Sequence, residues 1–525
     1  MRMLEANLFA LAQCDPACAE LLKQETRDTE LELCPSRRGG PTAALHRAGA
    51  PPRALYSRFD PARQAEREAA LFDTAAARAA GAVLVLGLGL GYHLDALMRL
   101  LPDTQFVVVE RRPALARAAL ARTDWCAALR TGRLCFVVGA APDQARVVAA
   151  RAAHAHVFRH PTLFAADMDY YYPLLRAHHS AAHPGQGLRV LSFSVPGAAV
   201  PFSFMDCHEA LRALGHTVRT VELHRHMRDR EVLDALHAAV TDFAPDLVFT
   251  IDVTGLVPEV LRPLGIPIIS WFFDDPVGFF TPDADGDRAQ ALSLESLGSN
   301  YRIFTWDRTY VEPLLTLGAP HAAHLPFAAN PRVFRPMEMS DEQRGQFACD
   351  VSFAGNSGSE RQGFTRRDVI GSLHAFDVRV YGDAGWEQVA RGGVRFLGRI
   401  HNREELPLLY TASRVNLNLT AKQLRTAVPI RVFDILAAGG FLISDYRADF
   451  IELFDDRREA VCCRDMDDLP DMIRYWLDRP DERRAVARAG RQKVLAAHTF
   501  EHRIAYILDS VQCADSRSAP PDSAI

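Results

Sequence analysis

Short apolar runs alternate along the chain with longer segments whose apolar side chains recur at helical spacing. In the first third, the runs at 82–86, 105–110 and 133–138 predict strands, and the segments between them predict helices. Strands that alternate with helices favour a parallel sheet, because each crossover helix returns the chain to the same end of the sheet. We therefore expect a Rossmann-like α/β domain over residues 1–183, with an irregular opening rich in proline and glycine.

The same alternation recurs in two further blocks, placed at residues 187–335 and 350–511. Their predicted strands are 188–193, 216–221, 246–251 and 267–272, then 351–353, 378–381, 394–397, 415–419 and 441–444. Two consecutive Rossmann-like domains form a cleft, and ligands bind such sheets at the carboxyl ends of the strands. The expected fold class is α/β with three Rossmann-like domains, the last two facing a cleft. Residues 514–525 are expected to be a disordered tail.

Composition narrows the class of protein. A chain of 525 residues is too long for one hydrophobic core, and 48% apolar residues can fill several. The net charge of −5 gives no support for nucleic acid as the main partner. The ten cysteines are scattered, which is typical of a reducing cytoplasm, and no metal site is evident. We expect a cytoplasmic protein without a signal peptide or transmembrane segment, since prolines interrupt its most apolar stretch, 190–205.

Glycine turns and charged side chains follow the strands of the third block. Gly355-Asn356 comes soon after 351–353, and Gly398-Arg399-Ile400 follows 394–397. Glycine allows backbone N–H groups to approach an anion closely. Farther along, cationic residues and one acid stand in order: Arg361, Lys422, Arg425, Arg431 and Asp434.

As a set, these motifs resemble the C-terminal domain of GT-B glycosyltransferases, specifically the spore-maturation CgeB-like group. The matching phrases are CDVSFAGN, FLGRIHNREELPLLYTASRVNLNLT and IRVFDILAAGGFLISDY, and the resemblance covers roughly residues 189–508. It implies a nucleoside-diphosphate sugar of UDP, GDP or dTDP type as the donor. It also implies that no metal or other cofactor is required.

The resemblance implies a role for each motif. Backbone groups of the Arg399-Ile400 turn would meet the base, and Asp434 would accept hydrogen bonds from the ribose hydroxyls. Cations stabilise the charge that gathers on a departing diphosphate, and the arginine fork suits phosphate oxygens. The candidates are Lys422, Arg425 and Arg431, with Arg361, Arg366 and Arg367 behind them; the last two are expected to be solvated. Alternatively, Gly382, Gly398 and Gly439 serve only turns and caps.

One position departs from the family pattern. Many retaining GT-B enzymes have two glutamates eight positions apart before this helix, whereas here Thr426 precedes Asp434. The retaining or inverting outcome therefore stays open, and the group that activates the acceptor is sought in the second block. Gly197 in the loop after the first strand would line the acceptor side, and Asp274-Asp275 after 267–272 would hold a sugar hydroxyl or supply the general base. The alternative for this acidic pair is a helix N-cap with a solvated neighbour.

The first block carries its own glycine turn. Gly87, Gly89 and Gly91 follow a buried strand, and Glu110 ends the next one. That arrangement suits adenosine binding, with Glu110 on a ribose diol. It resembles the turn of S-adenosylmethionine methyltransferases, and also the Rossmann-like domain of Maf flagellin-glycosylation proteins. The alternatives are a ligand site, or a scaffold or acceptor-docking domain that kept the fold.

We interpret the chain as a glycosyltransferase that moves a sugar from a nucleoside-diphosphate donor to a protein, such as flagellin, or to a cell-envelope glycan. The first alternative is an S-adenosylmethionine-dependent methyltransferase or a bifunctional enzyme. The second is a degenerate glycosyltransferase that acts as a non-catalytic binding module.

Overall fold

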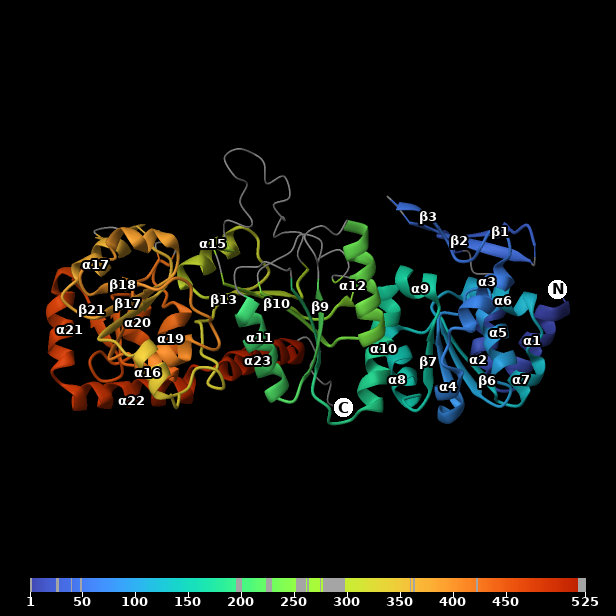
Figure 1. Cartoon of the computed structure of the whole chain (residues 1–525). Coiled ribbons are helices and arrows are strands. Elements are labelled where there is room, and N and C mark those ends of the chain that lie inside the picture. Colours follow the sequence, from blue (N-terminus) through green and yellow to red (C-terminus); the bar gives the residue numbers. More distant parts are fainter. Residues whose placement is uncertain are drawn as a thin grey trace, which may run out of the picture. The chain divides into compact units, whose positions relative to one another are not determined.

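The structure is a computed structural model of the whole chain (Figure 1). It describes all residues except 1, 25–27, 39, 48–49, 195–200, 223–228, 252–260, 262–263, 274, 277–297, 359, 362–363, 422–423 and 518–525. The chain forms two compact units. Unit 1 comprises Met1–Gln186, Asp234–Asp246 and Glu259–Gly265, and unit 2 comprises Gly187–Leu233, Leu247–Pro258 and Ile266–Ile525.

Unit 1 contains a four-stranded parallel sheet in the order β6-β5-β4-β7. Its strands are β4 (Ala82–Leu86), β5 (Gln105–Glu110), β6 (Leu134–Val138) and β7 (His156–Arg159). The helices are α1 (Arg2–Ala12), α2 (Pro16–Lys23), α3 (Pro61–Ala69), α4 (Thr74–Ala80), α5 (Tyr92–Leu100), α6 (Pro113–Arg122), α7 (Cys126–Arg130), α8 (Pro142–Arg151), α9 (Pro161–Ala166) and α10 (Met168–Ala182). The strands predicted at 82–86, 105–110 and 133–138 are thus present, and apolar residues of this sheet and its helices form one core.

The opening of unit 1 is regular where the sequence predicted an irregular stretch. Strands β1 (Leu31–Pro35), β2 (Pro41–Arg47) and β3 (Ala50–Ala54) form a small antiparallel sheet (Figure 1). Prolines stand at the ends of β1 and β2 and inside β3, which is an edge strand. Proline is tolerated at strand ends and sheet edges because no ladder hydrogen bond is lost there, which is why proline content alone was misleading.

Helix α12 (Asp229–Phe243) shows how the second block contributes to unit 1. The residues from Asp234 to Asp246 group with unit 1, although the sequence assigned them to the second domain. The Arg159 guanidinium bonds the carbonyl of Thr241 and the carboxylate of Asp242, and Arg176 Nε lies 3.3 Å from Asp246 Oδ1. These polar contacts attach the end of α12 to β7 and α10.

The first part of unit 2 is a parallel sheet in the order β13-β12-β11-β10-β8-β9. Its strands are β8 (Arg189–Ser194), β9 (Thr217–Glu222), β10 (Leu247–Ile251), β11 (Ile268–Phe272), β12 (Tyr301–Thr305) and β13 (Ala322–His324). Helix α11 (Pro201–Ala213), the short 3-10 helix η3 (Arg308–Tyr310) and helix α15 (Val311–Thr316) accompany it. The sequence predicted the first four strands and missed β12 and β13.

The second part of unit 2 is a parallel sheet in the order β18-β17-β14-β19-β20-β21. Its strands are β14 (Val351–Ala354), β17 (Val378–Tyr381), β18 (Val394–Phe396), β19 (Val415–Asn418), β20 (Leu442–Asp445) and β21 (Val461–Cys463), and β15 (Glu360–Arg361) pairs with β16 (Phe364–Thr365). The helices are α16 (Asp341–Phe347), α17 (Arg366–Ser372), η4 (Ala384–Val389), α18 (Leu406–Ala412), α19 (Ile430–Ala437), α20 (Ala448–Leu453), η5 (Met466–Asp468), α21 (Leu469–Leu477) and α22 (Pro480–Ala497). The last helix, α23 (Phe500–Arg517), packs against α11 of the first part.

Two helices differ from the sequence prediction. Helix α19 begins at Ile430, four residues before the predicted start at Asp434; Pro429 occupies the N-cap position without a side-chain cap hydrogen bond, so the start lacks the polar cap residue that marks many helices. Helix α23 continues to Arg517, past Ala514, where a tail was expected to begin; the remaining residues lie outside the described chain. Among the helices that the structure describes, none is long and apolar enough to span a membrane.

Candidate functional site

The candidate site lies where the strand order of the second sheet of unit 2 reverses. From β14 the chain first adds β17 and β18 on one side, and later adds β19, β20 and β21 on the other. The crevice outside the carboxyl ends of two such strands is the usual ligand site of an open parallel sheet. Gly355 follows β14 at this point, and its N–H donates to the carbonyl of Tyr381 at 2.9 Å. A Cβ on Gly355 would lie 2.8 Å from Arg431 Nη2, so glycine lets the guanidinium lie against the turn.

Arg431 and Arg366 bring two guanidinium groups to the same turn. Both lie over the ring of Phe353, with Cζ 5.3 Å and 5.6 Å from its centroid. Arg366 Nε donates to Leu419 O, and its Nη1 donates to Asn356 O, both at 2.9 Å. Arg366 therefore ties the end of β19 to the turn after β14. The sequence expected this residue to be solvated, but its side chain is buried; only Arg367 is partly exposed.

The two arginines concentrate positive charge. Burial, together with the neighbouring charge of Arg431, lowers the pKa of Arg366 to about 10. Within the described residues, neither guanidinium forms an ion pair, and Arg431 Nη1 donates to a neutral acceptor, Asn418 Oδ1, at 3.2 Å. Two adjacent cations without a paired acid favour a bound anion.

Asp434 stands three residues after Arg431 on α19, on the same side of the helix. Its carboxylate is buried, and no donor within the described part of the chain hydrogen-bonds to it. Burial raises its pKa well above the usual value; the charge of Asp206 acts in the same direction, and Arg431 opposes them. A buried carboxylate without a donor has open hydrogen-bonding capacity, which fits the predicted contact with ribose hydroxyls.

Asp206 belongs to a network that the sequence did not reveal. Arg403, after β18, donates to Asp206 Oδ1 at 2.7 Å and to Glu209 Oε1 at 2.6 Å. Asn330, in the connector between the sheets, donates to the same two carboxylates at 2.7 Å. Burial raises the pKa of Asp206 to about 6, although the donors Asn330 and Arg403 act against it. The network joins α11 to the loop after β18 and places a second acid close to Asp434.

Asp307, directly after β12, is a second polar contact between the two parts of unit 2. Its Oδ2 accepts backbone N–H bonds from Arg425, Thr426 and Ala427 at 2.8, 2.9 and 3.2 Å. Burial tends to raise its pKa, but the hydrogen bonds from Thr309, Thr426 and Ala427 outweigh it, so the pKa lies below the usual value. The available signal was an apolar run followed by Trp306-Asp307, two residues past the end of β12, and it was missed together with that strand.

The remaining predicted residues are placed as follows. Gly398, with φ of +81°, ends β18 and accepts the N–H of Gly382 at 2.8 Å. Arg399 is exposed, and the backbone N–H and C=O of Ile400 have no partner within the described chain, so this turn is open.

The Arg425 guanidinium stacks over the Tyr310 ring at 5.2 Å. Asn356 is exposed, and Asp275 is partly buried after β11. Gly197, Asp274 and Lys422 lie outside the described residues, as does the side chain of Arg361.

In unit 1, the Glu110 carboxylate accepts hydrogen bonds from the glycine turn in the protein interior. Its carboxylate is fully buried and accepts the N–H groups of Leu88 at 2.8 Å, Gly89 at 3.1 Å and Arg112 at 2.9 Å, and the Tyr171 hydroxyl at 3.2 Å. Burial raises its pKa to about 7 against these hydrogen bonds. The carboxylate predicted to bind a ribose diol is thus already hydrogen-bonded to the backbone of the turn.

Aromatic side chains fill the space beside the same turn. A Cβ on Gly89 would lie 2.5 Å from the Tyr56 hydroxyl, and one on Gly91 would lie 2.5 Å from Trp125 Cη2. A Cβ on Gly87 would lie 3.0 Å from His160 Cβ. The three glycines have positive φ and accommodate these neighbours. This packing favours the scaffold alternative over a ligand site at Gly87–Gly91.

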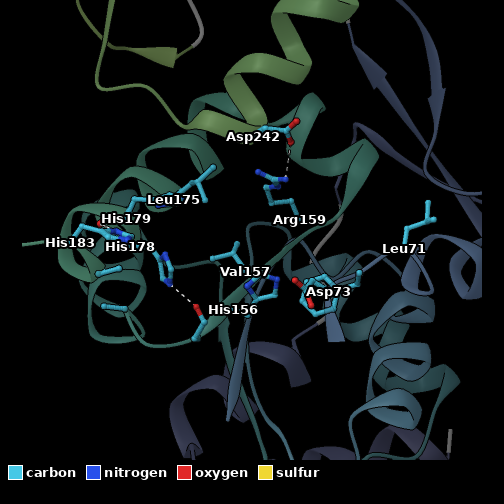
Figure 2. Close-up of a pocket in the computed structure, with 14 residues that line it drawn as sticks. Leu71, Asp73, His156, Val157, Arg159, Leu175, His178, His179, His183 and Asp242 are labelled. Carbon is cyan, nitrogen blue, oxygen red and sulfur yellow. Dashed lines mark hydrogen bonds and ion pairs between the residues drawn. The ribbon is translucent and has the colours of Figure 1, made fainter. Parts of the chain in front are cut away.

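Unit 1 has an open pocket beside β7, with a volume of about 610 Å³ (Figure 2). β7 is an edge strand, and His160 N bonds Leu86 O, so by alternation the backbone groups of Val157 and Arg159 face away from β4. His178 from α10 bonds Ala155 O at 3.0 Å through Nε2, and its Nδ1 has no partner among the described residues. Figure 2 shows Val157, Arg159 and the α10 histidines around this pocket. No group of described residues is arranged to hold a metal ion.

Comparisons with known proteins match both units. The glycosyl transferase-like family model matches residues 361–509, and the glycosyltransferase Maf N-terminal domain model matches residues 52–174. The search of curated proteins gives no match. Sucrose-phosphate synthase (tll1590) from Thermosynechococcus elongatus is similar in structure, with 15% identity, a TM-score of 0.47, and 63% of this chain and 100% of that chain covered. Anabaena Alr3699/HepE in complex with UDP-glucose gives 10% identity, a TM-score of 0.47, and coverages of 62% and 100%.

The two matches agree with the architecture. The first match covers the second sheet of unit 2 from β15 onward, including Arg366, Arg431 and Asp434. The second covers the parallel sheet of unit 1 and its glycine turn. This chain therefore carries a glycosyl transferase-like domain after a Maf-type N-terminal domain; it is a glycosyltransferase, and its unit 2 contains two parallel Rossmann-like sheets.

Proposed function

We propose that this glycosyltransferase uses a nucleoside-diphosphate sugar of UDP, GDP or dTDP type, and that its diphosphate binds between Arg366 and Arg431. The observation that carries the proposal is the pair of guanidiniums without an ion pair in the described chain, at the reversal point of a parallel sheet. The backbone N–H groups that open α19 add positive potential at the same place.

The same geometry supports a role in the chemical step. As the glycosidic bond breaks, negative charge grows on the diphosphate, and fixed cations stabilise it more than they stabilise the ground state. The donor would complete the open hydrogen bonds of Asp434 through its ribose diol. The open backbone groups of Ile400 would meet the base. Asp275 remains the proposed general base, because it follows β11 at the carboxyl edge of the other sheet. Asp274, the preceding residue, lies outside the described residues and stays a candidate by its place in the sequence.

For the acceptor, we propose a protein rather than a glycan, as the Maf-type domain of unit 1 favours. The open edge of β7 beside the 610 Å³ pocket supports this choice, because main-chain groups at strand spacing bind an extended peptide by adding it to the sheet. Flagellin is one candidate acceptor of this class. Unit 1 would then dock the acceptor rather than transfer a methyl group from S-adenosylmethionine.

The donor proposal is tested by calorimetric titration of the full chain with UDP, GDP, dTDP and S-adenosylhomocysteine. We expect one nucleoside diphosphate to bind, and Arg431→Ala and Asp434→Ala each to weaken it at least about tenfold. Asp478→Ala, which removes an exposed acid of the same unit, is the matched control and should leave affinity unchanged. Absence of binding by every nucleoside diphosphate at millimolar concentration would refute the proposal. Binding without release of sugar from any donor would favour the non-catalytic module.

The acceptor proposal is tested at Val157. Val157→Pro removes the outward N–H while an edge position tolerates proline, whereas Val157→Ala removes the side chain and keeps the N–H. We expect the proline variant to lose transfer to a protein acceptor while it still hydrolyses the donor, and the alanine variant to keep both. Equal transfer by both variants would exclude docking at this edge.

A further inference from the structure

A second pocket of unit 1, with a volume of about 590 Å³, lies at the carboxyl edge of its parallel sheet. Arg111 and Arg112 directly follow β5, and Asp167 follows the α9 helix that begins after β7. Arg47 from β2, Arg53 from β3 and His237 from α12 also line this pocket. The packing around Gly87–Gly91 leaves this neighbouring pocket open.

Three guanidiniums converge on one carboxylate. Asp167 is fully buried, and it accepts from Arg47 Nη2 at 2.7 Å, from Arg111 Nη1 at 3.2 Å, and from Arg112 Nε and Nη2 at 3.1 and 3.0 Å. The single buried anion thus fixes the positions of three cations. Arg112 has further acidic partners in Asp28 and Glu30, at 2.9 Å each, so its charge is compensated locally.

Arg47 and Arg111 have N–H donors that form no hydrogen bond within the described chain. Arg47 makes one hydrogen bond through Nη2, and Arg111 uses only Nη1, toward Asp167 and Asp169, within the described chain. Their side chains are 45% and 37% exposed, so the remaining N–H groups can reach a ligand in the pocket. Arg53 forms no ion pair among the described residues, and His237 Nδ1 is buried without a partner there.

The α10 helix adds to the positive potential. Asp167 is its N-cap residue, but the side chain makes no cap hydrogen bond because the arginines engage it. The first-turn N–H groups of this fifteen-residue helix therefore lack a side-chain cap, and Met168 and Asp169 of that turn line the pocket. An oxyanion is the ligand that both an uncapped helix start and free guanidinium forks favour.

We propose that this pocket binds an oxyanion-bearing sugar ligand, whose phosphate or carboxylate is held by Arg47, Arg53 and Arg111. The volume exceeds what a bare anion needs and leaves room for a sugar-sized body. The site is separate from the donor site of unit 2, and it gives the Maf-type domain a binding activity of its own, independent of the β7 edge.

The experiment uses the full chain carrying Arg431→Ala, so that anion binding expected at the donor site is weakened. Glucose 1-phosphate and glucuronate are titrated by calorimetry at fixed ionic strength, because they offer a phosphate and a carboxylate on similar sugars. The variants are Arg53→Ala and Arg111→Ala. The matched control is Arg63→Ala, an exposed arginine of α3 whose removal changes net charge equally.

We expect one or both probes to bind, and each pocket variant to weaken binding at least about tenfold, with the control within about twofold. Binding of glucose 1-phosphate alone identifies a phosphate ligand, and binding of glucuronate alone identifies a carboxylate ligand. Arg53 has no ion pair to lose, so its variant should keep the wild-type melting temperature and report on binding only. No binding of either probe at millimolar concentration, or equal weakening by Arg63→Ala, overturns the proposal.

Discussion

The Asp307 carboxylate accepts both the backbone N–H of Thr426, at 2.9 Å, and its hydroxyl, at 3.0 Å. Thr426 occupies the position where many retaining GT-B enzymes resembled by this sequence have a glutamate. Here an acid from the end of β12, in the other part of unit 2, meets that position instead. The contact holds the loop that leads into α19, and therefore holds Arg431 and Asp434 indirectly.

We predict that Asp307→Asn lowers the free energy of unfolding of unit 2 by about 1–3 kcal/mol, because three N–H donors lose a charged acceptor. Urea unfolding at neutral pH measures the change. Asp467→Asn, which neutralises an exposed acid of the same unit, should stay within about 0.5 kcal/mol of the wild type. A stability equal to that of the control would mean that the contact contributes little.

Arg366 and Arg367 form a natural pair for a binding experiment, since they are adjacent in sequence but only the first contacts Leu419 and Asn356. Lysine cannot make both contacts at once with a planar fork. We predict that Arg366→Lys weakens nucleoside-diphosphate binding at least about tenfold, whereas Arg367→Lys changes it less than about twofold. Calorimetry gives the affinities. A lower melting temperature with unchanged affinity would assign Arg366 a structural role only.

His498 should make unit 2 sensitive to acid. Burial lowers its pKa to about 4, and the charges of Arg503, Lys493 and His502 add to the effect. Arg503 Nη2 donates to its neutral Nδ1 at 2.8 Å. The neutral form is favoured only in the folded state, so the stabilisation is present above pH 6.5 and is lost as pH falls toward 4.

We predict that the unfolding free energy falls by on the order of 1–3 kcal/mol across that window through this group. His498→Gln should flatten this part of the profile, and His183→Gln, at an exposed histidine of unit 1, should not. Urea titrations at several pH values provide the comparison. Parallel profiles for the wild type and His498→Gln would contradict the assignment.

Gly89 tests the filled turn of unit 1. With φ of +58° and a Cβ position 2.5 Å from the Tyr56 hydroxyl, Gly89→Ala should destabilise unit 1 by about 2–4 kcal/mol. Gly132→Ala is the control, because Gly132 has φ of +71° but nothing within 4 Å of its Cβ. It should cost only the backbone strain, about 1 kcal/mol. Thermal melts of both variants separate backbone strain from steric overlap. Equal losses of stability would mean that the Tyr56 side chain moves aside without an energetic cost.

The sequence by itself determined the class of protein and many of the elements, although not β12, β13 or the small sheet of β1–β3. A strand such as 82–86 is apolar on both faces because helices cover both sides of a parallel sheet, and this leaves a clear local signal. The motifs that include Arg431 and Asp434 likewise carried the family resemblance, and the match of residues 361–509 to the glycosyl transferase-like model confirms it at the level of a glycosyltransferase domain.

Only the tertiary structure decided which side chains meet. Arg366 was indistinguishable from Arg367 until α17 placed one of them against Phe353 and buried it. Asp206, Asn330 and Arg403 are distant in sequence and become one network only when α11 and the loop after β18 come together. Glu110 has the spacing of a ribose-binding acid, but its partners depend on how Tyr171 and the glycine turn pack around it. The spacing of residues in the sequence shows which side chains follow a given strand. The burial of a side chain and its hydrogen-bond partners depend on contacts between segments that are distant in the sequence.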